Sequence, residues 1–221
     1  MADMKDIQEE GEGMNLGFTK ELIDEIRDRK EANPGMFVSA WQEDEEGVDE
    51  KDLDDPVEKF LTAAEEGKLE ELAEMFAAEP SFVQAADRDG YTALHRAAYN
   101  NNLQIIDFLV SHGSNTEART NSGWTPLLSA ANWANFEAVG RLISKGADVN
   151  ALSEGHLSAL HLAVNSSCED PENIFHTVRY LLEAPGINAT VVSGAGDTPL
   201  DLARRNNGQI YHLIREFLDR P

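Results

Sequence analysis

The sequence predicts an all-α protein in which short helix pairs stack into an α-solenoid, and three observations support this prediction. The segment DGYTALHRAA at 89–98 recurs as SGWTPLLSAA at 122–131, an offset of 33 residues. Hydroxyl side chains and prolines stand where each copy would begin a helix, and glycines stand where a second helix would end. A unit of this size cannot bury its apolar face alone, so neighbouring units must stack to build one continuous core.

Further copies extend the pattern toward the C-terminus. LSALHLAV at 157–164 continues the 33-residue period, and GDTPLDLA at 196–203 follows after 40 residues. We expect four hydroxyl residues to cap the first helices: Thr92, Thr125, Ser158 and Thr198. Gly113 and Gly146 fit the left-handed position that ends a helix, which predicts that the second helices stop there.

This helix–turn–helix–turn unit resembles the ankyrin repeat, whose signature is T-P-L-H-x-A. The resemblance covers residues 56–221 and implies an ankyrin-repeat α-solenoid of about five units with degenerate ends. Their expected bounds are about 56–86, 87–119, 120–152, 153–191 and 192–221. The fourth unit is seven residues too long, which predicts an inserted loop at 166–171 and one extra residue near Pro185. The shifted apolar residues of the last unit predict a rotated final helix.

The acidic side chains concentrate in the first quarter of the chain. The full chain holds 41 Asp and Glu against 18 Lys and Arg, a net charge of −23, and residues 1–55 alone carry −13. The segment EDEEGVDEKDLDD at 43–55 repels itself and offers little apolar surface, so we expect a mostly disordered leader over 1–55. Apolar residues at helical spacing predict a short helix near 18–30.

Two large apolar residues stand just ahead of this acidic run. Phe37 and Trp41 are four residues apart, and apolar side chains within acidic segments can dock into the grooves of partner proteins. They could equally cover part of the folded domain. Both alternatives stay open at the level of sequence.

Composition and motifs exclude several classes of function. The shortage of lysine and arginine argues against direct contact with nucleic acid or an anionic membrane. No apolar run approaches the ~20 residues of a membrane span, and the single Cys168 can form no intrachain disulfide, which favours a reducing intracellular setting. We expect His95 and His161 to be buried and to bridge neighbouring turns. No metal-ligand spacing or nucleophile motif is present, so we expect no cofactor, no metal and no enzymatic activity.

The resemblance implies where a partner would bind. Ankyrin domains meet partners on their concave side, through the hairpin tips and the outward face of each first helix. The tip positions here are Arg88, Asp89, Tyr91, Asn121, Ser122, Trp124, Glu154 and His156, and the helix positions are Tyr99, Asn100, Asn132 and Trp133. The four aromatic residues suit a binding hot spot. In the structural alternative, Tyr91 and Trp124 stiffen neighbouring hairpins, and Trp133 fills a gap between helices.

Asn150 follows Asp148 and Val149 at the end of a unit. This position resembles the asparagine that ankyrin domains offer to an oxygen-sensing hydroxylase. The resemblance therefore implies a candidate hydroxylation site.

A narrower group within the family shares the acidic leader with its tryptophan, the YTALHRAAY and GWTPL segments and the final Tyr211-His212. Resemblance to that group implies a non-enzymatic protein in the nucleus, the cytoplasm or both, with a role in transcription regulation and differentiation. We therefore expect a monomeric adaptor that binds a partner protein through its concave surface. The alternative is a direct regulator of one enzyme, in which Phe37 and Trp41 act on the active site and the repeats serve as anchor.

Overall fold

The computed structural model describes residues 54–220. The predictions for the leader, namely the helix near 18–30 and the contacts of Phe37 and Trp41, lie outside these residues.

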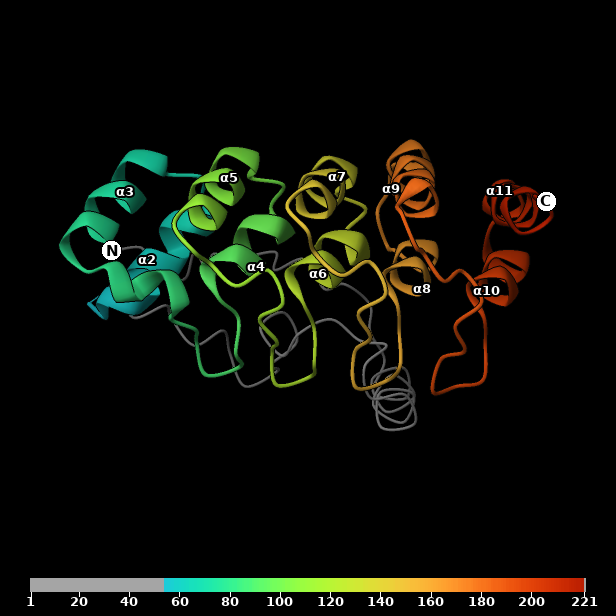
Figure 1. Ribbon diagram of the computed structural model, residues 1–221, viewed down its shortest axis with the longest axis horizontal. Coiled ribbons are helices and arrows are strands. Elements are labelled where there is room, and N and C mark those ends of the chain that lie inside the picture. Colours follow the sequence, from blue (N-terminus) through green and yellow to red (C-terminus); the bar gives the residue numbers. More distant parts are fainter. Residues whose placement is uncertain (1–53, 221) are drawn as a thin grey trace, which may run out of the picture.

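Five helix pairs follow one another along the solenoid (Figure 1). The pairs are α2 (Pro56–Glu65) with α3 (Leu69–Ala78), α4 (Ala93–Tyr99) with α5 (Leu103–Ser111), α6 (Pro126–Asn132) with α7 (Phe136–Ser144), α8 (Ala159–Val164) with α9 (Pro171–Glu183), and α10 (Pro199–Asn206) with α11 (Gly208–Leu218). The 3-10 helix η2 (Pro80–Gln84) follows α3. The described part of the chain contains no β-strand, which confirms the all-α prediction.

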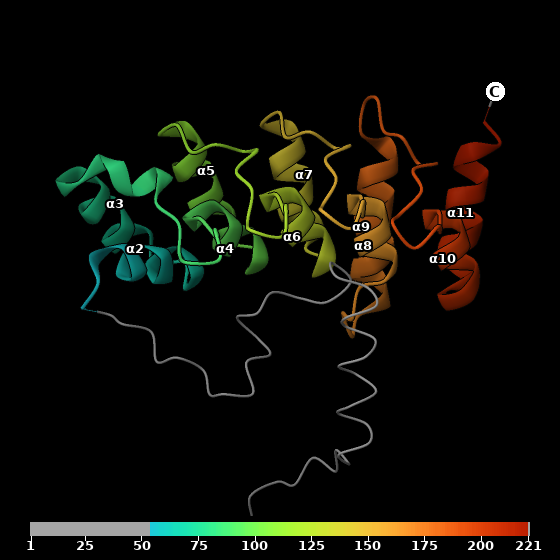
Figure 2. The ribbon, with the colours of Figure 1, turned by 90° about the horizontal axis from the view of Figure 1, so that it is seen from below.

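The helices form two layers. The first helices of the pairs lie side by side in one layer and the second helices in the other, while the loops between units project beyond the first layer (Figures 1 and 2). We call the layer of α2, α4, α6, α8 and α10, together with the projecting hairpins, the inner layer. The core lies between the layers, and small residues such as Ala97 and Ala130 are fully buried where α4 meets α6.

All four predicted hydroxyl residues occupy N-cap positions, but the hydroxyls of Thr92 and Ser158 contact the rings of His95 and His161. The Thr125 hydroxyl accepts a hydrogen bond from the Leu128 amide at 3.4 Å, and the Thr198 hydroxyl accepts one from the Asp201 amide at 3.2 Å. Gly113 follows the C-cap of α5 with a φ of +88°, a conformation that favours glycine.

The insertion in the fourth unit divides between loop and helix. Six residues, 165–170, separate α8 from α9, whereas three separate α4 from α5, and α9 has 13 residues where α5 has nine. The predicted loop is therefore confirmed at 166–170, whereas Pro171 already belongs to α9. The Asp170 side chain accepts from the Glu172 amide, and Pro171 begins the helix, so these residues start α9 about one turn early.

The last helix pair differs from the others in its connection. Only Asn207 separates α10 from α11, and its side chain accepts hydrogen bonds from the amides of Gln209 and Ile210. Ile210 and Ile214 are the buried residues of α11. No helix among residues 54–220 has the length and apolarity that crossing a bilayer requires.

Candidate partner-binding surface

Hydrogen bonds join the hairpin tips of consecutive units. The Asn121 amide donates to the Asp89 carbonyl at 2.8 Å, the Glu154 amide to Ser122 at 3.1 Å, and the Gly194 amide to Gly155 at 2.9 Å. The tips therefore form one continuous edge of the inner layer. Because each tip is fixed by its neighbour, a partner would meet a surface that is already ordered.

Tight backbone packing explains the residues at these tips. Gly90 has a φ of +85°, and a Cβ there would lie 2.9 Å from the Thr120 Cα atom. Gly123 has a φ of +73° at the equivalent position of the next unit, and the third tip uses His156 with a φ of +56°. Histidine tolerates this left-handed conformation better than most residues, and its side chain is exposed.

Most predicted contact residues are accessible, but two are buried. The exposed residues are Arg88, Asn100, Asn121, Ser122, Glu154 and His156, and the half-buried ones are Asp89, Tyr91, Tyr99 and Trp133. Trp124 is only 4% exposed and belongs to the apolar core, so for this residue the structure favours the stiffening role. Asn132 is 9% exposed. The surface as a partner site stays a prediction.

The structure brings together two of the four predicted aromatic residues. Tyr99 ends α4 and Trp133 is the C-cap of α6, and their rings meet edge to face with centroids 4.9 Å apart. Burial and the negative charge of Glu65 both raise the pKa of Tyr99. Tyr91 lies apart from this pair, with its ring 5.6 Å from that of His95.

The buried histidines bridge consecutive units, as predicted. His95 is fully buried, and its Nδ1 atom lies 2.9 Å from the Thr92 hydroxyl and 3.2 Å from the Thr92 amide. Because Nδ1 accepts from these groups, Nε2 carries the proton and donates to the Trp124 carbonyl at 3.0 Å. His161 repeats this arrangement between Ser158 and the Asp197 carbonyl.

This geometry keeps both imidazoles neutral. Burial lowers the pKa of His95 to about 4 and also lowers that of His161. The two histidines therefore act as fixed connectors rather than as exposed contact residues.

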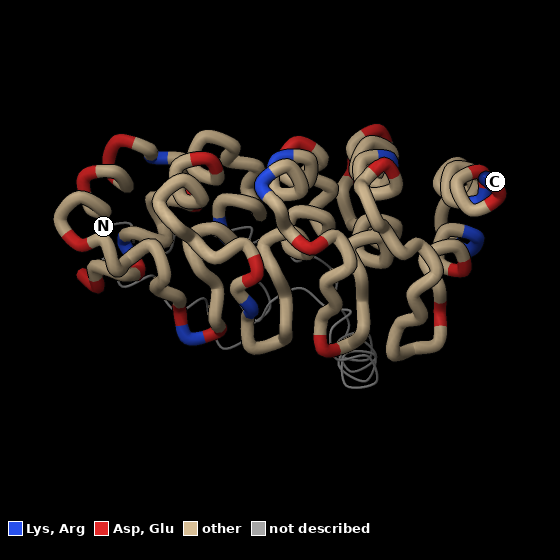
Figure 3. The backbone as a smooth tube through the Cα atoms, viewed as in Figure 1, with Lys and Arg blue, Asp and Glu red and all other residues tan. Residues whose placement is uncertain are grey.

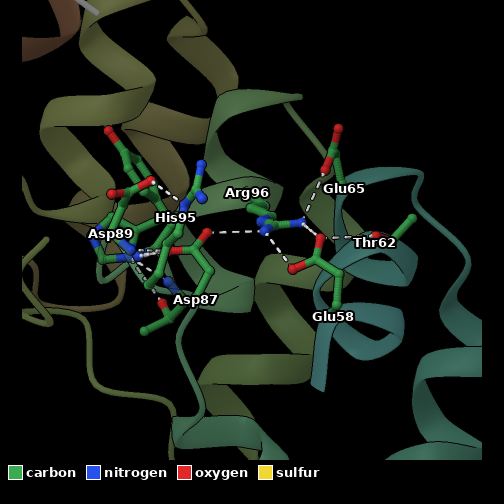
Figure 4. A network of polar contacts seen from close by, with 10 residues as sticks. Glu58, Thr62, Glu65, Asp87, Asp89, His95 and Arg96 are labelled. Carbon is green, nitrogen blue, oxygen red and sulfur yellow. Dashed lines mark hydrogen bonds and ion pairs between the residues drawn. The ribbon is translucent and has the colours of Figure 1, made fainter. Parts of the chain in front are cut away.

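A buried ion cluster that the sequence did not reveal lies within the inner layer, where it joins α2 to α4 (Figure 4). The Arg96 side chain is 8% exposed and donates two hydrogen bonds to Glu58, at 2.6 and 3.1 Å. It also donates to Asp87 at 2.9 Å and to Glu65 at 3.4 Å. Burial acts to lower the pKa of Arg96, but the bonds to Glu58 and Asp87 outweigh it and raise this pKa. The cluster ties the degenerate first unit to the second.

Two asparagines at equivalent positions were also missed. The Asn102 side chain donates to the carbonyls of Ala64 and Glu65, and the Asn135 side chain donates to those of Ala98 and Tyr99 at 3.1 and 2.6 Å. Each asparagine thus holds the end of the first helix in the preceding unit. Their spacing of 33 residues was the available signal.

Asn150 makes a similar connection at its own turn. Its side-chain nitrogen donates to the Gly186 carbonyl at 2.8 Å, and its oxygen accepts from the Asn188 amide at 2.8 Å. A modifying enzyme would need this turn to open. Hydroxylation of Asn150 stays a prediction.

The opposite layer carries an open groove that sequence analysis did not identify. It has a volume of about 490 Å³ and is lined by residues of α7 and α9, by Ala184 and Pro185 after α9, and by Leu103 of α5. Tyr180 of α9 lies in this groove, is 40% exposed and packs against Gly140 of α7. Among residues 54–220, no cluster of three or more His, Cys, Asp or Glu could hold a metal ion.

Comparisons with known proteins agree with this architecture. The family model for ankyrin repeats (3 copies) matches residues 60–153. The chain is 38% identical over 99 residues to ankyrin repeat domain-containing protein 49 of Drosophila melanogaster, covering 43% of this chain and 46% of the relative. The protein of the same name from Bos taurus is 35% identical over 96 residues, covering 37% and 40%.

A third relative is the palmitoyltransferase AKR1 of Candida glabrata, 33% identical over 119 residues, covering 51% of this chain and 16% of the relative. The matched segments therefore span less than half the length of each of the three relatives. The share of AKR1 that is matched is too small to transfer its activity to this chain. The predicted resemblance to ankyrin repeats, and to the narrower group, is confirmed.

Proposed function

We propose that this chain is a non-enzymatic adaptor, because the ankyrin repeats that it carries indicate a role in protein–protein interaction. It binds one partner protein through the inner layer, and Tyr99 and Trp133 form the centre of the contact. The observation that supports this proposal most directly is the half-buried aromatic pair on an ordered surface. Tyrosine and tryptophan give large contact areas and dominate binding hot spots.

The rigidity of the surrounding residues adds to this support. Asn135 holds the carbonyl of Tyr99, and the hairpin tips are joined from unit to unit. A surface ordered before binding loses less conformational entropy when a partner docks.

A second part of the proposal concerns the oligomeric state of the chain and its location in the cell. We propose a monomer in the nucleus or cytoplasm that acts in transcription regulation or differentiation. The support is the resemblance of the leader and repeats to the narrower group. Sedimentation of the purified chain tests the monomer, and imaging of a tagged chain in cells tests the location.

Partner capture tests the adaptor role. Full-length chains carrying wild-type sequence, Trp133→Ala or Tyr99→Ala serve as baits for quantitative mass spectrometry of bound proteins. The matched control is Tyr180→Ala, which removes an exposed aromatic ring from the opposite layer. We expect the inner-layer variants to lose the same partner that the control retains, with unchanged urea unfolding.

Two results would contradict the proposal. If all three variants capture the same proteins in the same amounts, the aromatic pair is not the site. If Trp133→Ala loses its partner and also unfolds at lower urea concentration than wild type, the ring has a structural role instead.

A further inference from the structure

The aromatic pair stands within a row formed by the C-terminal ends of the first helices on the inner layer. Each position consists of the last residue of a first helix and its C-cap. The row runs Glu65–Glu66 in α2, Tyr99–Asn100 in α4, Asn132–Trp133 in α6 and Val164–Asn165 in α8. Two aromatic rings therefore lie in the middle of the row, and two carboxylates lie on their N-terminal side.

Both carboxylates of this row have a cationic partner, since Glu65 pairs with Arg96 at 3.4 Å and Glu66 pairs with Lys68 at 2.6 Å. The eight positions of the row include two glutamates and no lysine or arginine. The charge of Glu65 reaches Tyr99, since it contributes to the raised pKa of that phenol. The nearby Arg96 is held in the buried ion cluster, where three carboxylates surround its single positive charge: Glu58, Glu65 and Asp87.

We propose that Tyr99 and Trp133 bind a lysine or arginine side chain from a basic segment of the partner protein. This inference rests on the proposed adaptor function and names the chemistry of its partner. A cation over a tryptophan or tyrosine ring is attracted by the negative face of the π-system, and this attraction grows as water is excluded. The ion cluster beside Tyr99 adds to the attraction, because its three carboxylates outnumber the single guanidinium of Arg96.

The overall charge of the chain favours the same partner. The net charge is −23, and acidic residues occur along the whole solenoid (Figure 3). A field of this sign speeds the encounter with a basic segment and disfavours acidic ones. The attraction should weaken as salt is added.

Titration with a synthetic peptide tests the inference. The probe is a fluorescein-labelled peptide of alternating arginine and glycine, and its control replaces each arginine with the neutral isostere citrulline. Binding to the full-length chain is followed by fluorescence anisotropy at low and moderate salt. The acidic leader is present in every protein compared, so differences between variants report on the row.

We expect Trp133→Ala to weaken binding of the arginine peptide at least fivefold and Trp133→Phe to weaken it less, since phenylalanine retains a ring with a weaker attraction for cations. Tyr180→Ala should leave it unchanged. Circular dichroism confirms that each variant is folded. Trp133→Phe preserves the packing better and keeps the test valid should the alanine variant unfold.

The inference would be overturned if wild type and Trp133→Phe bind the arginine peptide with equal affinity while Trp133→Ala is either unchanged or unfolded. Equal binding of the citrulline peptide would also overturn it. The adaptor proposal can survive either result. If Trp133→Ala still loses its cellular partner while the peptides show no preference for arginine, the surface binds a partner of different chemistry.

Discussion

Lowering the pH from 7 to 5 should destabilise the folded chain through His95. The unfolded chain takes up a proton near the ordinary histidine pKa of about 6.5, whereas burial holds the folded pKa at about 4. Between these values the unfolded state binds more protons than the folded state. The stabilising effect of the neutral imidazole is therefore present above pH 6.5 and is lost as the pH falls toward 4.

The two pKa values set the size of the effect. Proton linkage gives a loss of about 2 kcal/mol of unfolding free energy from His95 alone between pH 7 and pH 5. The lowered pKa of His161 acts in the same direction and adds to this loss. Protonation is unfavourable because the Thr92 amide and hydroxyl already point at Nδ1 of the fully buried ring.

Urea unfolding of wild type and His95→Gln at both pH values, at constant ionic strength, measures this contribution. The variant should be less stable than wild type at pH 7. The loss of unfolding free energy between pH 7 and pH 5 should, however, be about 2 kcal/mol smaller in the variant than in wild type. His156→Gln changes an exposed histidine and should keep the wild-type difference. If His95→Gln retains the full wild-type difference, the reasoning from burial is refuted.

Three further predictions concern stability measured by urea unfolding at pH 7. Arg96→Met should cost about 3–5 kcal/mol because it leaves buried carboxylates unpaired, whereas Arg205→Met at an exposed pair should leave the stability nearly unchanged. Equal losses would argue against the buried cluster. Asn135→Ala should cost about 1–3 kcal/mol by leaving two carbonyls without their donor, and a neutral result would exclude this role. Gly113→Ala should cost about 1–2 kcal/mol because its backbone is left-handed. Gly90→Ala should cost more because its added Cβ also meets Thr120. A larger loss of stability in Gly113→Ala than in Gly90→Ala would contradict the packing at the tips.

The repeat architecture could be predicted because each unit encodes its ends locally. A hydroxyl residue such as Thr125, followed by Pro126, specifies a helix start, and Gly113 specifies an end. The fourth unit shows the same rule at work. Asp170 and Pro171 are a capping residue and a helix-starting proline, so the helix begins earlier than the repeat period suggests.

The candidate site could be predicted only in part. The period locates the positions on the inner layer, but it does not determine which side chains the next unit covers, and Trp124 proved to be buried. Arg96 was missed because its acceptors come from separate segments, up to 38 residues away, and no local spacing joins them. The pairing of Tyr99 with Trp133 likewise depends on how two units stack.

The buried ion cluster makes the two ends of the solenoid unequal. At the N-terminal end, the guanidinium of Arg96 fastens α4 to α2 in a site shielded from water. At the C-terminal end, the ion pair between Arg205 and Asp197 is exposed to solvent and joins residues of the same unit. Warming should therefore make the molecule fray from α11 inward, and amide hydrogens there should exchange with deuterium before those of α2.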